Sequence, residues 1–327
     1  GNLLRNQVTG SFSARQQSWL NRQAVDTVVL VPDERSLIEA IGHWTDERFF
    51  PVLIEDAWYA PMFIEAYDPK RIVRWSAPKA DGDDEQTMAD LVRQRAPSHN
   101  AALAERPAET PPPPGLVVID PEHRRAPAGL VLALGRGQPI HLYQPPKLHD
   151  TRAEAKEFGP INEAIMREAV RWRLIRPEHW FGITLVGEYP DRFKAEKGPL
   201  AVDDLLGRDG RGLRLAVIGR LSRHSVFATY QAMCSLFLQP SRALFGDDYA
   251  RRNKQIFVAY RSDRAEKLLG QKLAITRLAG ETLALANLRS AWGGDEPLDM
   301  VWINSSGGPR GFAFGAGGKN GSPDDLP

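Results

Sequence analysis

Short apolar segments alternate with amphipathic segments along the first half of the chain, and this alternation limits the fold more than any other sequence feature. An apolar run such as Thr27–Val31, closed by Pro32, is typical of a buried strand, whereas the spacing of Leu37, Ile38 and Ile41 is typical of a helix. Strands that alternate with helices predict a parallel sheet. Strands are expected at residues 27–31, 51–54, 71–75, 116–119 and 139–143, and helices at residues 34–44, 60–67, 85–94 and 128–134.

The second half of the chain continues the same pattern. Strands are expected at residues 181–186, 213–218, 255–260 and 298–304, and helices at residues 159–176, 226–238, 265–273 and 280–291. At about 150 residues per domain, 327 residues correspond to about two domains. We therefore expect an N-terminal extension (1–24), a first α/β subdomain (25–145) and a second α/β subdomain (146–327), both doubly wound with mostly parallel sheets.

Composition excludes several classes of protein. Lys and Arg number 42 against 41 for Asp and Glu, so the net charge of +1 gives no general attraction to nucleic acid. The single cysteine excludes an internal disulfide framework and a multi-cysteine metal site. No apolar run approaches the ~18 residues of a membrane span. The first residues lack a signal-peptide core and the last ones are loop-like, so we expect part of a longer protein, and both a cytoplasmic and an exported location stay open.

The generic catalytic patterns yield no self-contained site. No phosphate-binding loop follows a strand, and the glycines at residues 315–318 precede no helical pattern. Cys234 and His224 lie ten residues apart along one expected helix, which separates them by about 15 Å at 1.5 Å per residue. They therefore cannot form a nucleophile–base pair. The apolar neighbours of Cys234 predict a buried structural cysteine.

Three carboxylates near residue 205 are candidate ligands for a hard cation. Asp203, Asp204 and Asp209 offer the oxygen ligands that calcium prefers. Two arginines interrupt the set, and a solvated turn is the alternative interpretation. Calcium at Asp203 and Asp209 is the one cofactor that the sequence suggests, and no other is expected.

Loops that follow parallel strands are the expected position of any site, and three of them begin at Gly187, Gly219 and Ser305. The segments around these strand ends share an order and spacing with a known family. That order resembles the gingipain-type cysteine peptidases of the caspase-like clan, over roughly residues 180–307. The resemblance rests on residues 183–188 (ITLVGE), 202–207 (VDDLLG), 208–221 (RDGRGLRLAVIGRL) and 299–307 (DMVWINSSG).

The resemblance implies a histidine–cysteine dyad in which a thiolate attacks a peptide carbonyl. Ser306 occupies the position that matches the family's histidine and is expected to be inactive as a base. The strand that carries the family's cysteine would follow Pro327. The family's fold is therefore expected here without its activity.

The loops that would shape a peptide pocket in such a fold are present. They contain Gly187, Asp203, Asp204, Ser305 and Gly307. The sequence thus favours a pseudoenzyme that binds a peptide or protein partner or acts as a scaffold, with a second chain or a C-terminal continuation completing the fold. One alternative is an active cysteine endopeptidase whose catalytic residues lie beyond residue 327, so enzymatic activity stays open. A second alternative is a small-molecule-binding α/β module.

Overall fold

A computed structural model provides the structure of the chain. It describes residues 24–45, 47–78, 86–107, 110, 112–143, 159–176, 181–187, 192–195, 198–201, 205–213, 215–221, 225–238, 242–247, 270, 273–279, 285–292, 300–304, 306–308, 311–314 and 319–321. The chain divides into two compact units, residues 1–238 and 239–327, and each is described by itself. No helix in the described ranges has both the length and the apolar character to cross a membrane.

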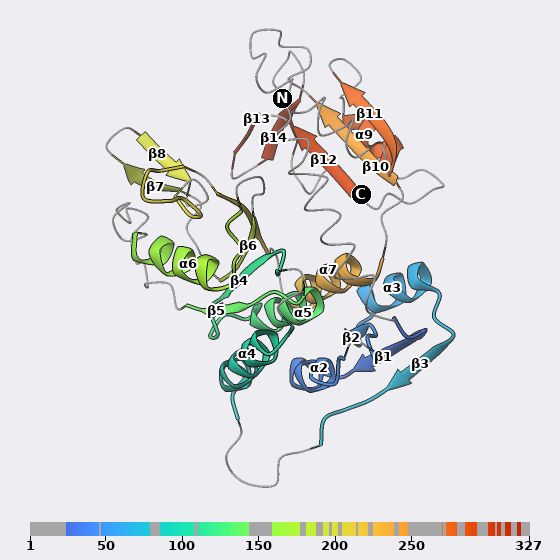
Figure 1. The fold of residues 1–327 in the computed structure, drawn as a ribbon. Helices are drawn as coiled ribbons and strands as arrows, with labels where there is room; N and C mark the ends of the chain where they lie inside the picture. Colours follow the sequence, from blue (N-terminus) through green and yellow to red (C-terminus); the bar gives the residue numbers. More distant parts are fainter. Residues whose placement is uncertain are drawn as a thin grey trace. The chain divides into compact units, whose positions relative to one another are not determined.

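The first sheet of unit 1 has three parallel strands in the order β2-β1-β3 (Figure 1). The strands are β1 (Thr27–Val31), β2 (Val52–Ile54) and β3 (Arg71–Arg74), connected through α2 (Glu34–Ile41) and α3 (Tyr59–Tyr67). Helix α2 begins where the Asp33 side chain accepts the N–H of Ser36 at 2.7 Å, a typical N-cap.

The second sheet of unit 1 has four parallel strands in the order β5-β4-β6-β9. Its elements are β4 (Gly115–Ile119), β5 (Ile140–Leu142), β6 (Phe181–Val186), β9 (Ala216–Arg220) and the helices α4 (Met88–Ala104), α5 (Ala126–Arg136), α6 (Gly159–Arg171) and α7 (Ser225–Phe237). A hairpin of β7 (Arg192–Ala195) and β8 (Gly198–Ala201) lies between β6 and β9 in sequence.

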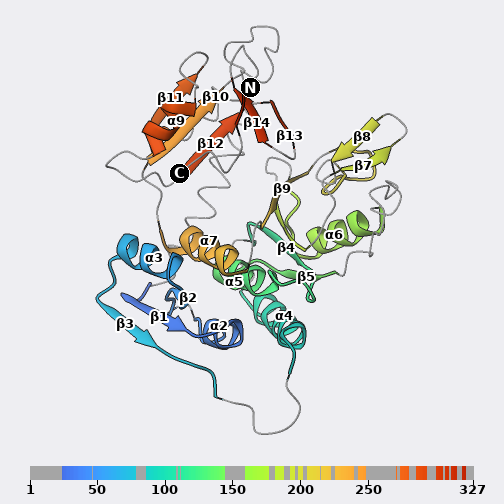
Figure 2. The same ribbon diagram turned by 180° about the vertical axis from the view of Figure 1, so that it is seen from behind.

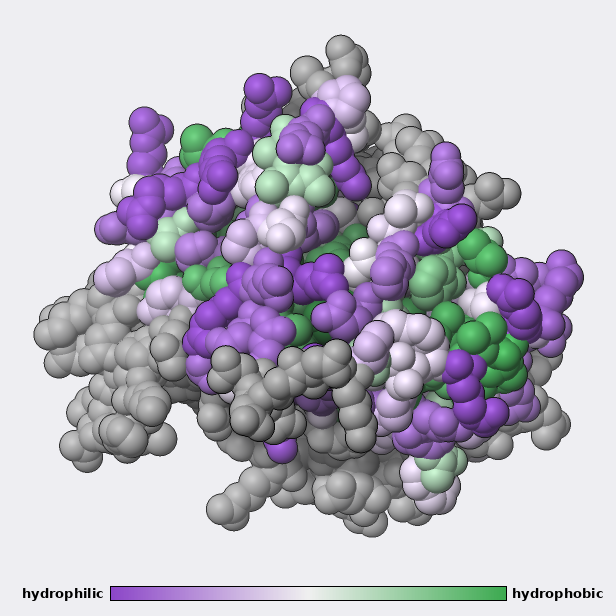
Figure 3. Space-filling view, turned by 90° about the horizontal axis from the view of Figure 1, so that it is seen from below, coloured by the Kyte–Doolittle hydropathy of each residue, from purple (hydrophilic) through white to green (hydrophobic). Residues whose placement is uncertain are grey.

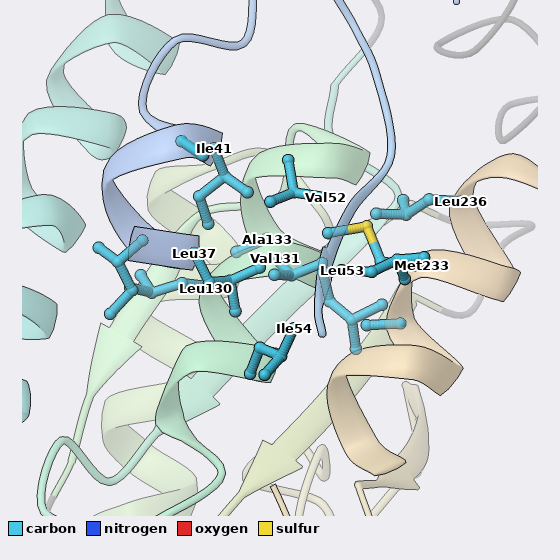
Figure 4. Close-up of a cluster of buried hydrophobic side chains, with 14 of the residues drawn as sticks. Leu37, Ile41, Val52, Leu53, Ile54, Leu130, Val131, Ala133, Met233 and Leu236 are labelled. Atoms are coloured by element: carbon cyan, nitrogen blue, oxygen red, sulfur yellow. The ribbon is translucent and has the colours of Figure 1, made fainter. Parts of the chain in front are cut away.

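Helix α5 is the centre of unit 1. Its residues are apolar on nearly all sides and almost all buried, as expected for a helix inside a core. Figure 4 shows Leu130 and Val131 of α5 among side chains of α2, β2 and α7. Gly129 permits close approach to the sheet, because a Cβ there would lie 3.0 Å from side-chain carbons of both Ile119 and Val186. The shared core joins both sheets of unit 1.

Strand β4 is buried on both faces, and each face belongs to a different core. Val117 and Ile119 pack in the cluster that contains α5, whereas Leu116 and Val118 pack with residues of α6. Alternate residues of a strand point to opposite faces, so α5 and α6 cover opposite faces of this sheet. On the face of the molecule in Figure 3, hydrophobic residues form separate patches among hydrophilic ones.

Unit 2 contains a smaller parallel sheet in the order β11-β10-β12. Its elements are β10 (Arg242–Asp247), β11 (Ala274–Ala279), α9 (Leu285–Trp292), β12 (Met300–Asn304), and the antiparallel strands β13 (Ser306–Gly308), β14 (Gly311–Phe314) and β15 (Lys319–Gly321). Leu244, Phe245 and Leu288 are fully buried in this unit.

The structure confirms an α/β fold with mostly parallel sheets, but it divides the chain differently from the sequence expectation. Strand β4, before residue 145, pairs with β6 beyond it, so residues 25–145 and 146–238 share one sheet. The observed division follows Leu238. Strands β13 and β14 occupy part of the segment that was expected to be loop. The expected strand at 255–260 and the expected helix at 265–273 lie outside the described residues, as does most of the N-terminal extension.

Candidate functional site

The strand order of the four-stranded sheet creates a switch point between β4 and β6. The chain passes from β4 to β5 on one side and then returns to β6 on the other side of β4. Ile119 and Val186 are register partners at the carboxyl ends of these two strands. Ligands of open α/β sheets bind outside the carboxyl ends of the strands at such a point. The residues that follow β4 and β6 are therefore the first candidates for a functional site.

Asp120 follows β4 directly and is the central charged residue of this edge. Its backbone N–H donates to the carbonyl of Val186 at 2.8 Å, which fixes the residue against β6. Its Oδ1 accepts the N–H of Glu122 at 3.1 Å. The residue is 8% exposed, and burial raises the pKa of its carboxyl above the ordinary value. The edge of the sheet thus holds a fixed carboxyl group that burial makes a weaker acid than an exposed aspartate.

The turn from Asp120 to Arg125 is fixed by hydrogen bonds at both of its ends. The N–H of His123 donates to the carbonyl of Asp120 at 3.1 Å, and His123 Nδ1 accepts the N–H of Arg125 at 3.2 Å. With Nδ1 accepting, the neutral imidazole carries its proton on Nε2. The Arg125 guanidinium donates to the carbonyl of Leu221, just after β9, at 3.0 Å. Glu122 pairs with Arg93 of α4.

Tyr143 stands at the same edge, directly after β5. Its N–H donates to the carbonyl of Ile119 at 2.9 Å, and burial raises the pKa of its hydroxyl. The edge therefore holds a carboxyl and an imidazole, groups that donate and accept hydrogen bonds, while the Tyr143 side chain packs against the core that contains α6 residues. Asp120 to Arg125 were missed from the sequence. An aspartate directly after the apolar run at residues 116–119 was the available signal.

The sequence-predicted pocket residues are only partly described. Gly187 lies directly after β6, at the edge just described, as expected. Asp203, Asp204 and Ser305 lie outside the described residues. Ser306 and Gly307 belong to β13 of unit 2, where they pair with Ala313 and Phe312 of β14.

Asp209, the second residue of the candidate calcium pair, organises a turn. Its Oδ1 accepts the N–H groups of Arg211 at 2.9 Å and of Leu213 at 2.8 Å. Gly212 completes the turn with a φ of 78°, a conformation that favours glycine. Within the described ranges, no group of three or more His, Cys, Asp or Glu could hold a metal ion. Because Asp203 is not among those residues, calcium binding stays a prediction.

Cys234 lies in α7 and packs against the core that contains α5. Burial raises the pKa of its thiol to about 11, so the thiol is protonated at neutral pH. This environment agrees with the structural role expected from the sequence. His224 lies outside the described residues.

The comparisons with known proteins give no relative. No family model matches the chain, and no significant match is found among curated proteins or solved structures.

Proposed function

We propose that this chain is a non-catalytic, gingipain-like protein that binds peptides at the carboxyl ends of β4 and β6. The observation that carries the proposal is the contrast between two sites. The only cysteine is half-buried in α7 with a raised thiol pKa, whereas the strand-end edge carries Asp120 and His123 and no thiol. A protonated thiol is a poor nucleophile at neutral pH, while hydrogen-bonding groups stand where α/β sheets bind ligands.

The strand-end residues suit the polar groups of a peptide. Asp120 offers a carboxylate that accepts peptide N–H or ammonium donors. It belongs to a turn whose backbone is fixed against β6 and whose Arg125 is fixed to the residue after β9. Such fixed groups lose little conformational entropy when a ligand binds.

The proposal is tested by selecting linear peptides from a display library on the intact protein and measuring their affinities. The Asp120→Asn variant removes the charge but keeps the acceptor that holds Glu122. We expect it to weaken binding about tenfold, because a hydrogen bond to a charged group contributes about 1.5–3 kcal/mol. Glu65→Gln, an exposed carboxylate on α3, is the matched control and should bind like the wild type.

Two results would overturn the proposal. Equal affinity of the Asp120→Asn variant and the wild type for the peptide would show that the peptide does not bind at this edge. Cleavage of the selected peptides that is blocked by a thiol-alkylating reagent would show an active cysteine peptidase. Selection of no peptide, with retention of a small molecule on the purified protein, would instead favour the small-molecule-binding alternative.

A further inference from the structure

The outer edges of strands β3 and β5 differ in whether another element covers them. The edge of β5 is covered by α4, because Asn100 Nδ2 donates to the carbonyl of Ile140 at 2.8 Å and Asn100 Oδ1 accepts the Ile140 N–H at 2.9 Å. Strand β3 pairs with β1 alone, and both ribbon views show it at the outer side of its sheet (Figures 1 and 2). In the described part of the chain, β3 has no equivalent cover.

The outward-facing backbone groups of β3 can be assigned from the ladder. The N–H of Trp75 donates to the carbonyl of Leu30, so Trp75 and Val73 direct their amides to β1. Because amides alternate along a strand, Ile72 and Arg74 direct theirs away from the sheet. Unpaired edge groups of this kind are a template for a further strand.

A hollow of about 670 Å³ adjoins this strand. Its apolar lining comes from Val29 of β1, Ala40 of α2, Val73 and Trp75 at β3, and Phe50. The volume lies within the range of about 300–1,000 Å³ that is usual for ligand sites. Val73 and Trp75 share one face of β3, so a strand added beside them places alternate side chains at the hollow.

The charges around the hollow favour an acidic partner. Arg71 shares the face of Val73, and Arg48 lines the hollow; neither has an ion-pair partner among the described residues. Lys70 and Arg74 are already paired with Asp26 and Glu55, at 2.8 Å and 2.9 Å. Glu47 is the acidic side chain of the lining, so Arg48 and Arg71 together leave one positive charge in excess.

We propose that β3 binds an extended acidic segment of a partner protein as an additional strand. The backbone of Ile72 and Arg74 pairs with the segment, an apolar side chain of the segment enters the hollow beside Val73 and Trp75, and an acidic side chain two positions away faces Arg71. The recognised pattern is therefore an acidic residue separated by one residue from an apolar one. This surface is independent of the strand-end site of the proposed function.

The test uses a fluorescent synthetic peptide with an aspartate and a leucine two positions apart, and anisotropy on the full chain. We expect saturable binding that falls about tenfold in Arg71→Glu, in line with the loss and reversal of one charge contact. A peptide of the same sequence with methylated backbone nitrogens should not bind, because it cannot pair with the strand. Asp120→Asn should bind this peptide like the wild type.

Ile72→Pro provides a second variant, which removes an outward N–H together with the exposed isoleucine side chain. Proline is tolerated on an edge strand where its nitrogen faces solvent, so the protein should fold and bind the peptide weakly. Circular dichroism checks the fold of each variant. Equal binding of the methylated peptide, no binding by the wild type, or unchanged binding by Arg71→Glu would overturn the proposal. Dimerisation of the chain that Arg71→Glu abolishes, without peptide binding, would also overturn it in favour of a second copy.

Discussion

Asp120 shows at the residue scale how burial sets the charge state of a strand-end carboxyl. Its folded pKa lies above the ordinary value of 3.8, because burial disfavours the ionised form more than its hydrogen bond favours it. A raised carboxyl pKa contributes stability that is fully present below the ordinary pKa and is lost as pH rises through the folded pKa. Ionisation of the Asp120 carboxyl at neutral pH therefore lowers the free energy of unfolding of the wild type, and this decrease is the cost of ionisation.

Asp120→Asn should remove that cost, because asparagine stays neutral and keeps an acceptor for the Glu122 N–H. We predict that the stability of the variant relative to the wild type increases as pH rises from about 4 to 7. Urea unfolding at several pH values measures the difference. A difference independent of pH, or one that falls with rising pH, would contradict the raised pKa.

Cys234 gives the second prediction at this scale. A thiol with a pKa of about 11 is protonated at neutral pH, and it lies in the packed face of α7. Native protein should react with a thiol-specific disulfide reagent slowly at pH 7.5, and unfolded protein should react at the rate of a free cysteine. Rapid reaction of the native thiol would show that the residue is accessible and ionised.

At the scale of elements, the pairing of β4 with β6 depends on one glycine. Gly115 and Gly182 are register partners, but a Cβ on Gly115 would collide with the Gly182 carbonyl oxygen, whereas one on Gly182 would lie 3.7 Å from the Pro114 carbonyl oxygen. Gly115→Ala should destabilise the protein by at least about 1–3 kcal/mol, the usual cost of overpacking. Gly182→Ala should change stability little. Thermal unfolding compares the two, and equal effects would contradict the register.

The cover of β5 supplies another prediction. Asn100→Ala leaves both the N–H and the carbonyl of Ile140 without their side-chain partners, at a cost of about 1–3 kcal/mol for each buried group. The opened edge should also increase self-association. Ser98→Ala, which removes a hydroxyl that bonds within its own helix, is the control. Unchanged stability and sedimentation of Asn100→Ala would refute this role.

The sequence predicted those elements whose local pattern is strong. Thr27–Val31 and Phe181–Val186 are continuous apolar runs between turn residues, and both are strands at the expected positions. Strand β10 was missed, because its sequence RALFGD contains only a short apolar run between polar residues. The position of Gly187 after a strand could be predicted because the preceding apolar run is clear, and its role in a pocket stays a prediction. Asp120 was not found, because the Val186 carbonyl that fixes its backbone belongs to β6, which lies far away in sequence.

At the scale of the whole molecule, long-range pairing decides the domain division. Local patterns cannot show that β4 pairs with β6, which is why the expected boundary at residue 145 differs from the observed division after Leu238. Both core clusters of unit 1 contain only residues up to Leu238. All residues that form the two cores of unit 1 therefore lie within residues 1–238.

A fragment of residues 1–238 should accordingly unfold cooperatively in urea, whereas a fragment of residues 1–145 should not, because it lacks β6 and α7. Circular dichroism and fluorescence measure both transitions. Cooperative unfolding of the shorter fragment would instead support the domain boundary at residue 145 that the sequence predicted.

The central claim is that the chain binds peptides without cleaving them. The most direct test is to measure the mass of a bound peptide over time. A peptide selected on the intact protein is incubated with it under reducing conditions, and the bound and free fractions are analysed by mass spectrometry. The account predicts binding that depends on Asp120 and a peptide mass that does not change with time. Fragments that accumulate with time and disappear on alkylation of thiols would contradict it.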